Sequence, residues 1–119
     1  MHEVSIALAL VEQVKAHRPA GRRVLAVAIE AGAMQAIEPD AMAMAWESVV
    51  AGTELAGVRL DLTRLPYRLR CETCGREWAA QDMFAACACG SETTLPTGGS
   101  ELRLVSLEVE DELATATQT

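Results

Sequence analysis

The sequence is poor in aromatic residues and in bases. Tryptophan, tyrosine and phenylalanine make up 3% of its 119 residues although half of the residues are hydrophobic, so the core must be aliphatic. Ten lysines and arginines stand against seventeen acidic residues, which gives a net charge of −7. This balance argues against general binding to nucleic acid, because such binding requires bases that neutralise phosphates.

Membrane and catalytic signatures are also missing from the sequence. No apolar stretch approaches the roughly 20 residues that span a bilayer, and the first residues lack the cationic segment of a signal peptide. We find no phosphate-binding loop and no Ser-His-Asp or Cys-His arrangement. We therefore expect a cytoplasmic protein that is not an enzyme, has no catalytic residues and has no membrane partner.

Hydrophobic periodicity predicts an α+β fold in which two helices cover one face of a small three-stranded sheet. The helices are expected over residues 4–18 and 38–50, and the strands over 23–31, 58–63 and 101–110. Pro39 fits the first turn of the second helix, where its missing N–H has no partner to lose. We expect residues 1–67 plus 99–119 to form this domain.

Four cysteines lie in one segment, at spacings typical of a zinc site. Two residues separate Cys71 from Cys74, one separates Cys87 from Cys89, and a glycine follows each pair. Glycine permits the left-handed backbone of a tight turn that brings a second thiolate around the same ion. Four thiolates in a reducing compartment favour a closed structural zinc site over disulfides. We predict that residues 68–98 form an inserted zinc-ribbon-like lobe whose folding depends on the metal.

Other interpretations of the cysteines are a redox dithiol, unrelated buried thiols and an iron–sulfur cluster. A redox pair would not need the second pair, and the repeated Cys-Gly turns favour zinc over iron. The single residue between Cys87 and Cys89, where two are usual, predicts that the second turn is tighter than the first.

The residues Met1-His2-Glu3 form a second candidate metal site. An α-amino nitrogen, a backbone amide nitrogen and an imidazole can chelate one ion in small rings, and a plane of nitrogens suits Ni(II) or Cu(II). Glu3 could add an oxygen or orient the imidazole. Taken alone the signal is weak, since most early histidines bind no metal.

Several motifs along the chain occur together in one known family. The sequence opens with MHEVSIA, continues with an aliphatic strand and Ile37-Glu38-Pro39-Asp40, and ends its cysteine segment with Cys-Gly-Ser. A closing strand follows, Gly99-Ser100-Glu101-Leu102 with Ser106-Leu107-Glu108. In this order the motifs resemble the HypA/HybF family of nickel metallochaperones for hydrogenase maturation, over about residues 1–110.

The resemblance implies a site at each of the two clusters. It implies that His2 binds nickel with support from Glu3, and it ties a carboxylate at the start of the second helix, here Glu38, to nickel. It assigns the zinc to Cys71, Cys74, Cys87 and Cys89. Ni(II) is then the cargo and Zn(II) a structural ion. The implied partners are the GTPase HypB and the large subunit of nickel–iron hydrogenase, with urease served by some relatives, and the chain is expected to be a monomer or homodimer.

The chain departs from the family in the cysteine segment. Cys87-Ala88-Cys89 replaces the common Cys-Pro-x-Cys, and no histidine flanks the cysteines, so we expect no histidine-based zinc switch. The second histidine, His17, ends the first expected helix, where an interaction with the helix dipole is expected.

A zinc-ribbon module that binds nucleic acid or the transcription machinery is the alternative function. Half of the ten bases fall within eighteen residues, namely Arg59, Arg64, Arg68, Arg70 and Arg76. They form either a solvated strand face or a docking surface for an acidic partner. The net charge of −7 and the scarcity of aromatic residues count against nucleic acid.

Overall fold

The computed structural model describes residues 2–110 and divides the chain into two compact units. Of the described residues, the first unit contains 2–29, 37–62 and 104–110, and the second contains 30–36 and 63–103. Two helices and two small three-stranded sheets make up the fold, so the predicted α+β class is confirmed. Within the described residues, no helix is both long and apolar enough to cross a membrane.

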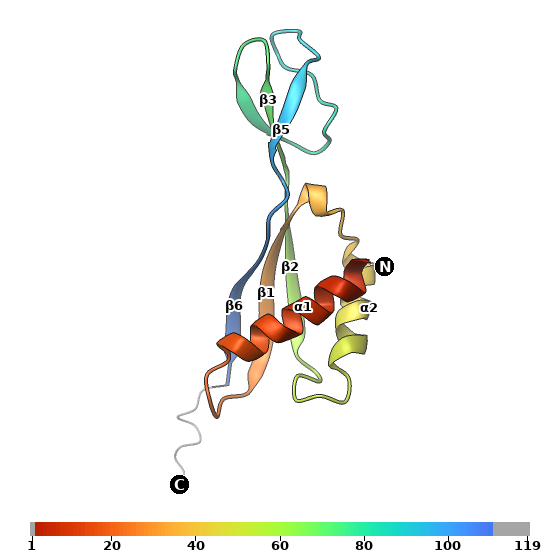
Figure 1. Cartoon of the computed structure of the whole chain (residues 1–119), viewed down its shortest axis with the longest axis vertical. Coiled ribbons are helices and arrows are strands. Elements are labelled where there is room, and N and C mark those ends of the chain that lie inside the picture. Colours follow the sequence, from red (N-terminus) through yellow and green to blue (C-terminus); the bar gives the residue numbers. More distant parts are fainter. Residues whose placement is uncertain (1, 111–119) are drawn as a thin grey trace. The chain divides into compact units, whose positions relative to one another are not determined.

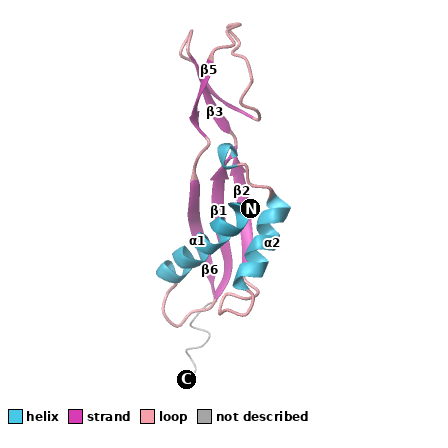
Figure 2. Ribbon diagram, turned by 45° about the vertical axis from the view of Figure 1, so that its right-hand side comes forward, coloured by secondary structure: helices cyan, strands magenta, loops and turns pink. Residues whose placement is uncertain are grey.

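One sheet has the strand order β2-β1-β6, with β1 in the centre. Its strands and the two helices are α1 (His2–His17), β1 (Val24–Gly32), α2 (Pro39–Val50), β2 (Arg59–Leu65) and β6 (Leu102–Val109). Both helices lie on the same side of this sheet (Figures 1 and 2). The predicted helices and strands are therefore present, and α1 begins two residues earlier than the periodicity indicated.

The core of the first unit lies between the helices and β1. The helices contribute Ala7, Leu10, Val11, Val14, Met42, Ala45, Trp46 and Val50, all buried. The pattern on β1 is almost continuously buried, as expected of a central strand. The indole of Trp46 donates a 2.8 Å hydrogen bond to the carbonyl of Val58, so the one polar atom of this side chain is satisfied inside the core.

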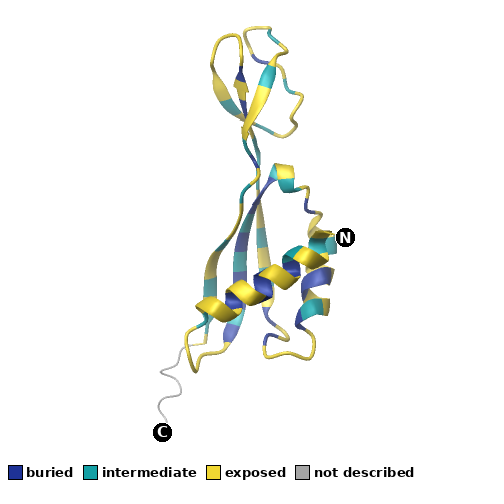
Figure 3. Cartoon of the chain, viewed as in Figure 1, coloured by how far each residue is buried: buried dark blue, intermediate teal, exposed yellow. Residues whose placement is uncertain are grey.

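The second unit contains the sheet β4-β3-β5 and very little core. Its strands are β3 (Tyr67–Cys71), β4 (Glu77–Ala80) and β5 (Thr94–Gly98), and both neighbours of β3 pair with it antiparallel. Its buried hydrophobic side chains among the described residues are those of Ala31, Leu69, Cys71 and Cys87. Figure 3 shows how little of these strands is buried. Such a core cannot offset the conformational entropy of ordering about fifty residues, so another stabilising element is required.

Residues 30–36 join the second unit through three hydrogen bonds to the segment before β6. The N–H of Gly32 donates to Glu101 and that of Met34 to Gly99, each at 2.7 Å. The amide of Gln35, in a short 3-10 helix (Ala33–Gln35), donates to Ser100. A Cβ at Gly32 would lie 2.1 Å from the Gly99 carbonyl oxygen, so glycine is required at this approach.

Candidate metal centres

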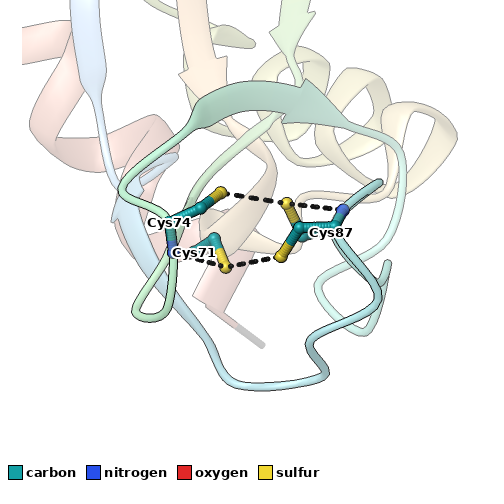
Figure 4. A group of neighbouring side chains, drawn as sticks. Cys71, Cys74 and Cys87 are labelled. Atoms are coloured by element: carbon teal, nitrogen blue, oxygen red, sulfur yellow. Dashed lines mark hydrogen bonds between the residues drawn. The ribbon is translucent and has the colours of Figure 1, made fainter.

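The four cysteines converge in the second unit. Cys71 ends β3, Cys74 follows in the adjoining turn, and Cys87 and Cys89 lie in the segment before β5. Their four sulfur atoms all lie within 4.8 Å of one another. Figure 4 shows the thiols of Cys71, Cys74 and Cys87 directed towards a common centre.

The spacing of these sulfur atoms fits a tetrahedral metal ion. Cys71 Sγ lies 3.7 Å from Cys89 Sγ, and Cys74 Sγ lies 3.6 Å from Cys87 Sγ. Four sulfurs each about 2.3 Å from a central zinc lie about 3.8 Å apart at tetrahedral angles. A disulfide would need about 2.05 Å. The cluster therefore fits four-thiolate zinc coordination and contains no disulfide.

Two glycine turns build the cluster. The N–H of Gly75 donates to the carbonyl of Cys71, four residues back, and the N–H of Gly90 donates to that of Cys87, three residues back. Both glycines have left-handed backbones, with φ of 79° and 94°. The second turn is thus the tighter one, as the spacing of its cysteines predicted. A side chain at either glycine would force an L-residue into a disfavoured conformation.

Backbone N–H groups lower the pKa of two of the four thiols. The N–H groups of Cys74 and Thr73 point at Cys71 Sγ, at 3.5 and 3.4 Å, and lower the pKa of that thiol to about 6. The N–H of Cys89 likewise lowers the pKa of Cys87. Metal ligands must be thiolates, so these N–H groups favour the form that binds.

The fourth thiol is affected in the opposite direction. An N–H of Ser91 acts to lower the pKa of Cys89, but the neighbouring Cys87 and Cys71 outweigh it and raise that pKa to about 11. Negative charge accumulating at one centre disfavours a further thiolate until a cation compensates it. This electrostatic arrangement therefore favours a divalent cation at the centre.

A hydrogen bond between two hydroxyl groups beside the cysteines was not predicted from the sequence. The hydroxyl of Thr73 donates to that of Ser91 at 2.9 Å, which links the first turn to the second. Ser and Thr are common in turns for many reasons, and their partner here lies eighteen residues away, so spacing could not reveal it.

The second candidate centre lies in the first turn of α1. His2 Nδ1 is 3.5 Å from Glu3 Oε1, and the other oxygen of Glu3 accepts a 3.3 Å bond from the N–H of Glu38. The side chain of His2 is 49% exposed and that of Glu3 only 13%. The N–H groups of Glu3 itself and of Glu38 hold the pKa of the Glu3 carboxyl below its usual value. Glu3 is thus an anchored carboxylate beside an accessible imidazole.

Glu38 caps α2. Its carboxylate accepts from the N–H of Ala41 at 2.7 Å and from that of Asp40 at 3.2 Å. These N–H groups have no intrahelical acceptor, and the negative charge also suits the positive end of the helix. Glu38 therefore fixes the start of α2, and its own N–H ties that start to Glu3.

Replacing Glu38 by alanine should lower the free energy of unfolding by about 1 kcal/mol, because the cap is lost. Urea denaturation followed by circular dichroism measures this change. Glu47, exposed in the last turn of α2, gives the control, since Glu47→Ala removes a carboxylate that caps nothing. Equal stability of the two variants would contradict a capping role for Glu38.

His17 lies too far from His2 to share an ion with it. It ends α1 fifteen residues later, about 22 Å along the helix axis. Its Nδ1 lies 2.9 Å from the carbonyl of Gln13, within the last turn. The structure thus places His17 at the helix end that favours a cation, as the sequence indicated.

A family model described as "HypA: Hydrogenase/urease nickel incorporation, metallochaperone, hypA" matches residues 1–109. The chain belongs to this family. The hydrogenase maturation factor HypA of Geobacter metallireducens is 40% identical over 111 residues, which cover 92% of this chain and all of that protein. HypA of Geobacter sulfurreducens is 38% identical with the same coverage.

Solved HypA structures share the fold. The solution structure of the Ni metallochaperone HypA from Helicobacter pylori superposes with a TM-score of 0.58 at 23% identity, and covers 89% of this chain and 95% of that one. A second HypA solution structure gives a TM-score of 0.60 at 24% identity, with 92% and 97% covered. The family resemblance predicted from the motifs is confirmed, and the nucleic-acid alternative receives no support from the family match.

Proposed function

We propose that this chain is a carrier, not an enzyme, that binds Ni(II) at its N-terminus and delivers it in the cytoplasm to a nickel enzyme under maturation. The observation that carries the proposal is the family match over residues 1–109. The ion is cargo, so the chain needs ligands that take it up and a way to release it.

The proposed nickel ligands are the amine of Met1, the amide nitrogen of His2 and the imidazole of His2. Amide groups in the first turn of a helix have no intrahelical acceptor, so their use by a metal breaks no helical hydrogen bond. The contact between His2 Nδ1 and Glu3 Oε1 supports a role for Glu3, either as an oxygen ligand or in orienting the imidazole. Glu38 contributes indirectly, because its backbone N–H donates a hydrogen bond to the carboxylate of Glu3.

Release follows from the position of these ligands. Groups at a chain terminus are few and exposed, so an acceptor can replace them one at a time without unfolding the domain. An accessible imidazole, 49% exposed, is open to such an approach. The implied acceptors are the GTPase HypB and the large subunit of nickel–iron hydrogenase, with urease as a further recipient.

The proposed role of the second centre is structural. Zinc held by Cys71, Cys74, Cys87 and Cys89 would supply the stabilisation that the small core of the second unit lacks. Four thiolates leave no open coordination position, so this ion would take no part in transfer. In this proposal the zinc ion stabilises the second unit and the nickel ion is the cargo.

The N-terminal amine gives a direct test of the nickel site. Adding Gly-Ser before Met1 removes that amine from chelation, and we expect nickel affinity to fall at least tenfold while zinc content and circular dichroism stay unchanged. The same two residues added after Thr119 are the control. Equilibrium dialysis with metal analysis reports both ions. Equal nickel affinity of the two extended chains would exclude a chelate that includes the amine.

A further inference from the structure

Four arginines of the second unit stand without a carboxylate partner in a strongly acidic protein. Arg18, Arg23, Arg59 and Arg103 each form an ion pair. Across residues 2–110, no carboxylate oxygen lies within 4.0 Å of the side-chain nitrogens of Arg64, Arg68, Arg70 or Arg76. The chain has seventeen acidic residues that could pair with arginine. The four arginines without such a partner all lie between residues 64 and 76, which suggests that they serve another purpose.

Two of these arginines project from one face of β3. Burial alternates along the strand: Leu69 and Cys71 are buried, whereas Arg68 and Arg70 are exposed. Side chains alternate between the two faces of a strand, so both guanidinium groups lie on the face opposite the buried cysteine. β3 therefore carries Cys71 of the cysteine cluster on one face and the two arginines on the other.

The neighbouring strand leaves this face open and partly apolar. Arg70 is directly opposite Leu95 on β5, and Leu95 is 42% exposed. Arg68 is opposite Gly98, and its stem lies over this glycine, since a Cβ at Gly98 would be 3.3 Å from the Cβ of Arg68. Arg76 differs, because its guanidinium stacks 5.0 Å above the Trp78 ring. Arg68, Arg70 and Leu95 are named the arginine face below.

We propose that the arginine face docks a carboxylate-rich protein surface of a nickel-delivery partner. Paired with carboxylates, guanidinium groups form bidentate hydrogen bonds that fix orientation as well as attract. An exposed leucine beside two arginines has the composition of a protein interface, in which apolar residues and arginine are enriched. The identity of the partner rests on the function proposed above; the chemistry it must present rests on this face alone.

Nucleic acid fits this face less well than protein does. A polyphosphate backbone would approach a chain of net charge −7 and would encounter Glu77, which lies opposite Arg70 on β4. Two arginines neutralise few phosphates, whereas binding to a duplex commonly engages six or more contacts. A protein partner can place individual carboxylates against the arginines and avoid the acids nearby.

Charge reversal tests the proposal. The variant Arg68→Glu/Arg70→Glu is compared with the native chain for binding to purified HypB and to the hydrogenase large-subunit precursor, by calorimetry without nickel, in 50 and 300 mM NaCl. The control, matched in net charge, is Lys15→Glu/Arg23→Glu on the first unit, which also removes the 3.9 Å ion pair of Arg23 with Glu110. Zinc content and circular dichroism establish that each variant is folded.

We expect the Arg68→Glu/Arg70→Glu variant to bind at least one of the two partners about tenfold or more weakly at 50 mM NaCl and to lose most of the salt dependence. The control should stay within about twofold of the native chain. Unchanged affinity for both partners, or an equal loss in the control, would overturn the proposal. Tight binding of a generic DNA duplex that depends on the same arginines would also overturn it. Because nickel is absent, failure here is independent of any failure of the nickel site.

Discussion

Replacing Cys74 by alanine should release the zinc and unfold the second unit while the first unit stays folded. Cys74 is exposed, so its replacement leaves no cavity, and the effect reports the loss of a ligand. Structural zinc contributes on the order of 10 kcal/mol in small zinc domains. The second unit has almost no apolar core to replace that contribution. The first unit keeps its own core between α1, α2 and β1.

Metal analysis and two-dimensional NMR measure this effect. We expect about one zinc per native chain and almost none in Cys74→Ala, with amide signals of residues 67–98 moving to random-coil positions. Thr73→Ala is the control, because it removes only the hydroxyl contact with Ser91 and leaves all four thiols. A Cys74→Ala variant that kept one zinc per chain, or dispersed signals for the second unit, would contradict a structural role for the cluster.

Replacing His2 by alanine should weaken nickel binding at least a hundredfold and leave zinc and stability unchanged. The imidazole is the one side chain in the proposed chelate that supplies nitrogen, the donor that Ni(II) favours. Its side chain is half exposed and lies outside the core, so its removal costs little packing. The loss should therefore appear in nickel affinity alone.

The second histidine provides the matched control for this experiment. His17→Ala removes the same group from the opposite end of α1, where it contacts the Gln13 carbonyl. We expect this variant to bind nickel as the native chain does. Isothermal titration at neutral pH compares the two variants, and X-ray absorption identifies imidazole ligation directly. Nickel binding that survived in His2→Ala but was lost in His17→Ala would overturn the N-terminal site.

Local patterns in the sequence predicted most of the elements of the first unit. The spacing of Ile6, Leu10 and Val14, with Ala7 and Val11 alongside, indicated the apolar face of α1, and all of these except the partly buried Ile6 are buried. Pro39 marked the first turn of α2. These predictions succeeded because a helix face or a helix start depends on residues within one or two turns. The start of α1 was placed two residues late, because His2 and Glu3 contribute no apolar periodicity.

The zinc lobe was predictable as a cluster but not as a sheet. Cysteine spacing and the following glycines indicated four converging thiols and a tighter second turn. The sequence did not predict the short strands β3, β4 and β5. Burial does alternate along β3, but over only five residues, and neither β4 nor β5 contains a buried residue. The inclusion of residues 30–36 in the second unit also escaped notice, since it depends on hydrogen bonds to residues 99–101.

The sequence by itself indicated four cysteines for one metal ion, because ligand type and close spacing are local properties, and its motifs indicated the family from which the nickel ligands were predicted. The tertiary structure alone decided how those residues are held. The N–H of Glu38 reaches Glu3 across thirty-five positions, and β3 carries the cysteine cluster on one face and two arginines on the other. Such contacts join residues that are far apart in the sequence. They form only when distant segments pack together, so no local pattern of residues predicts them.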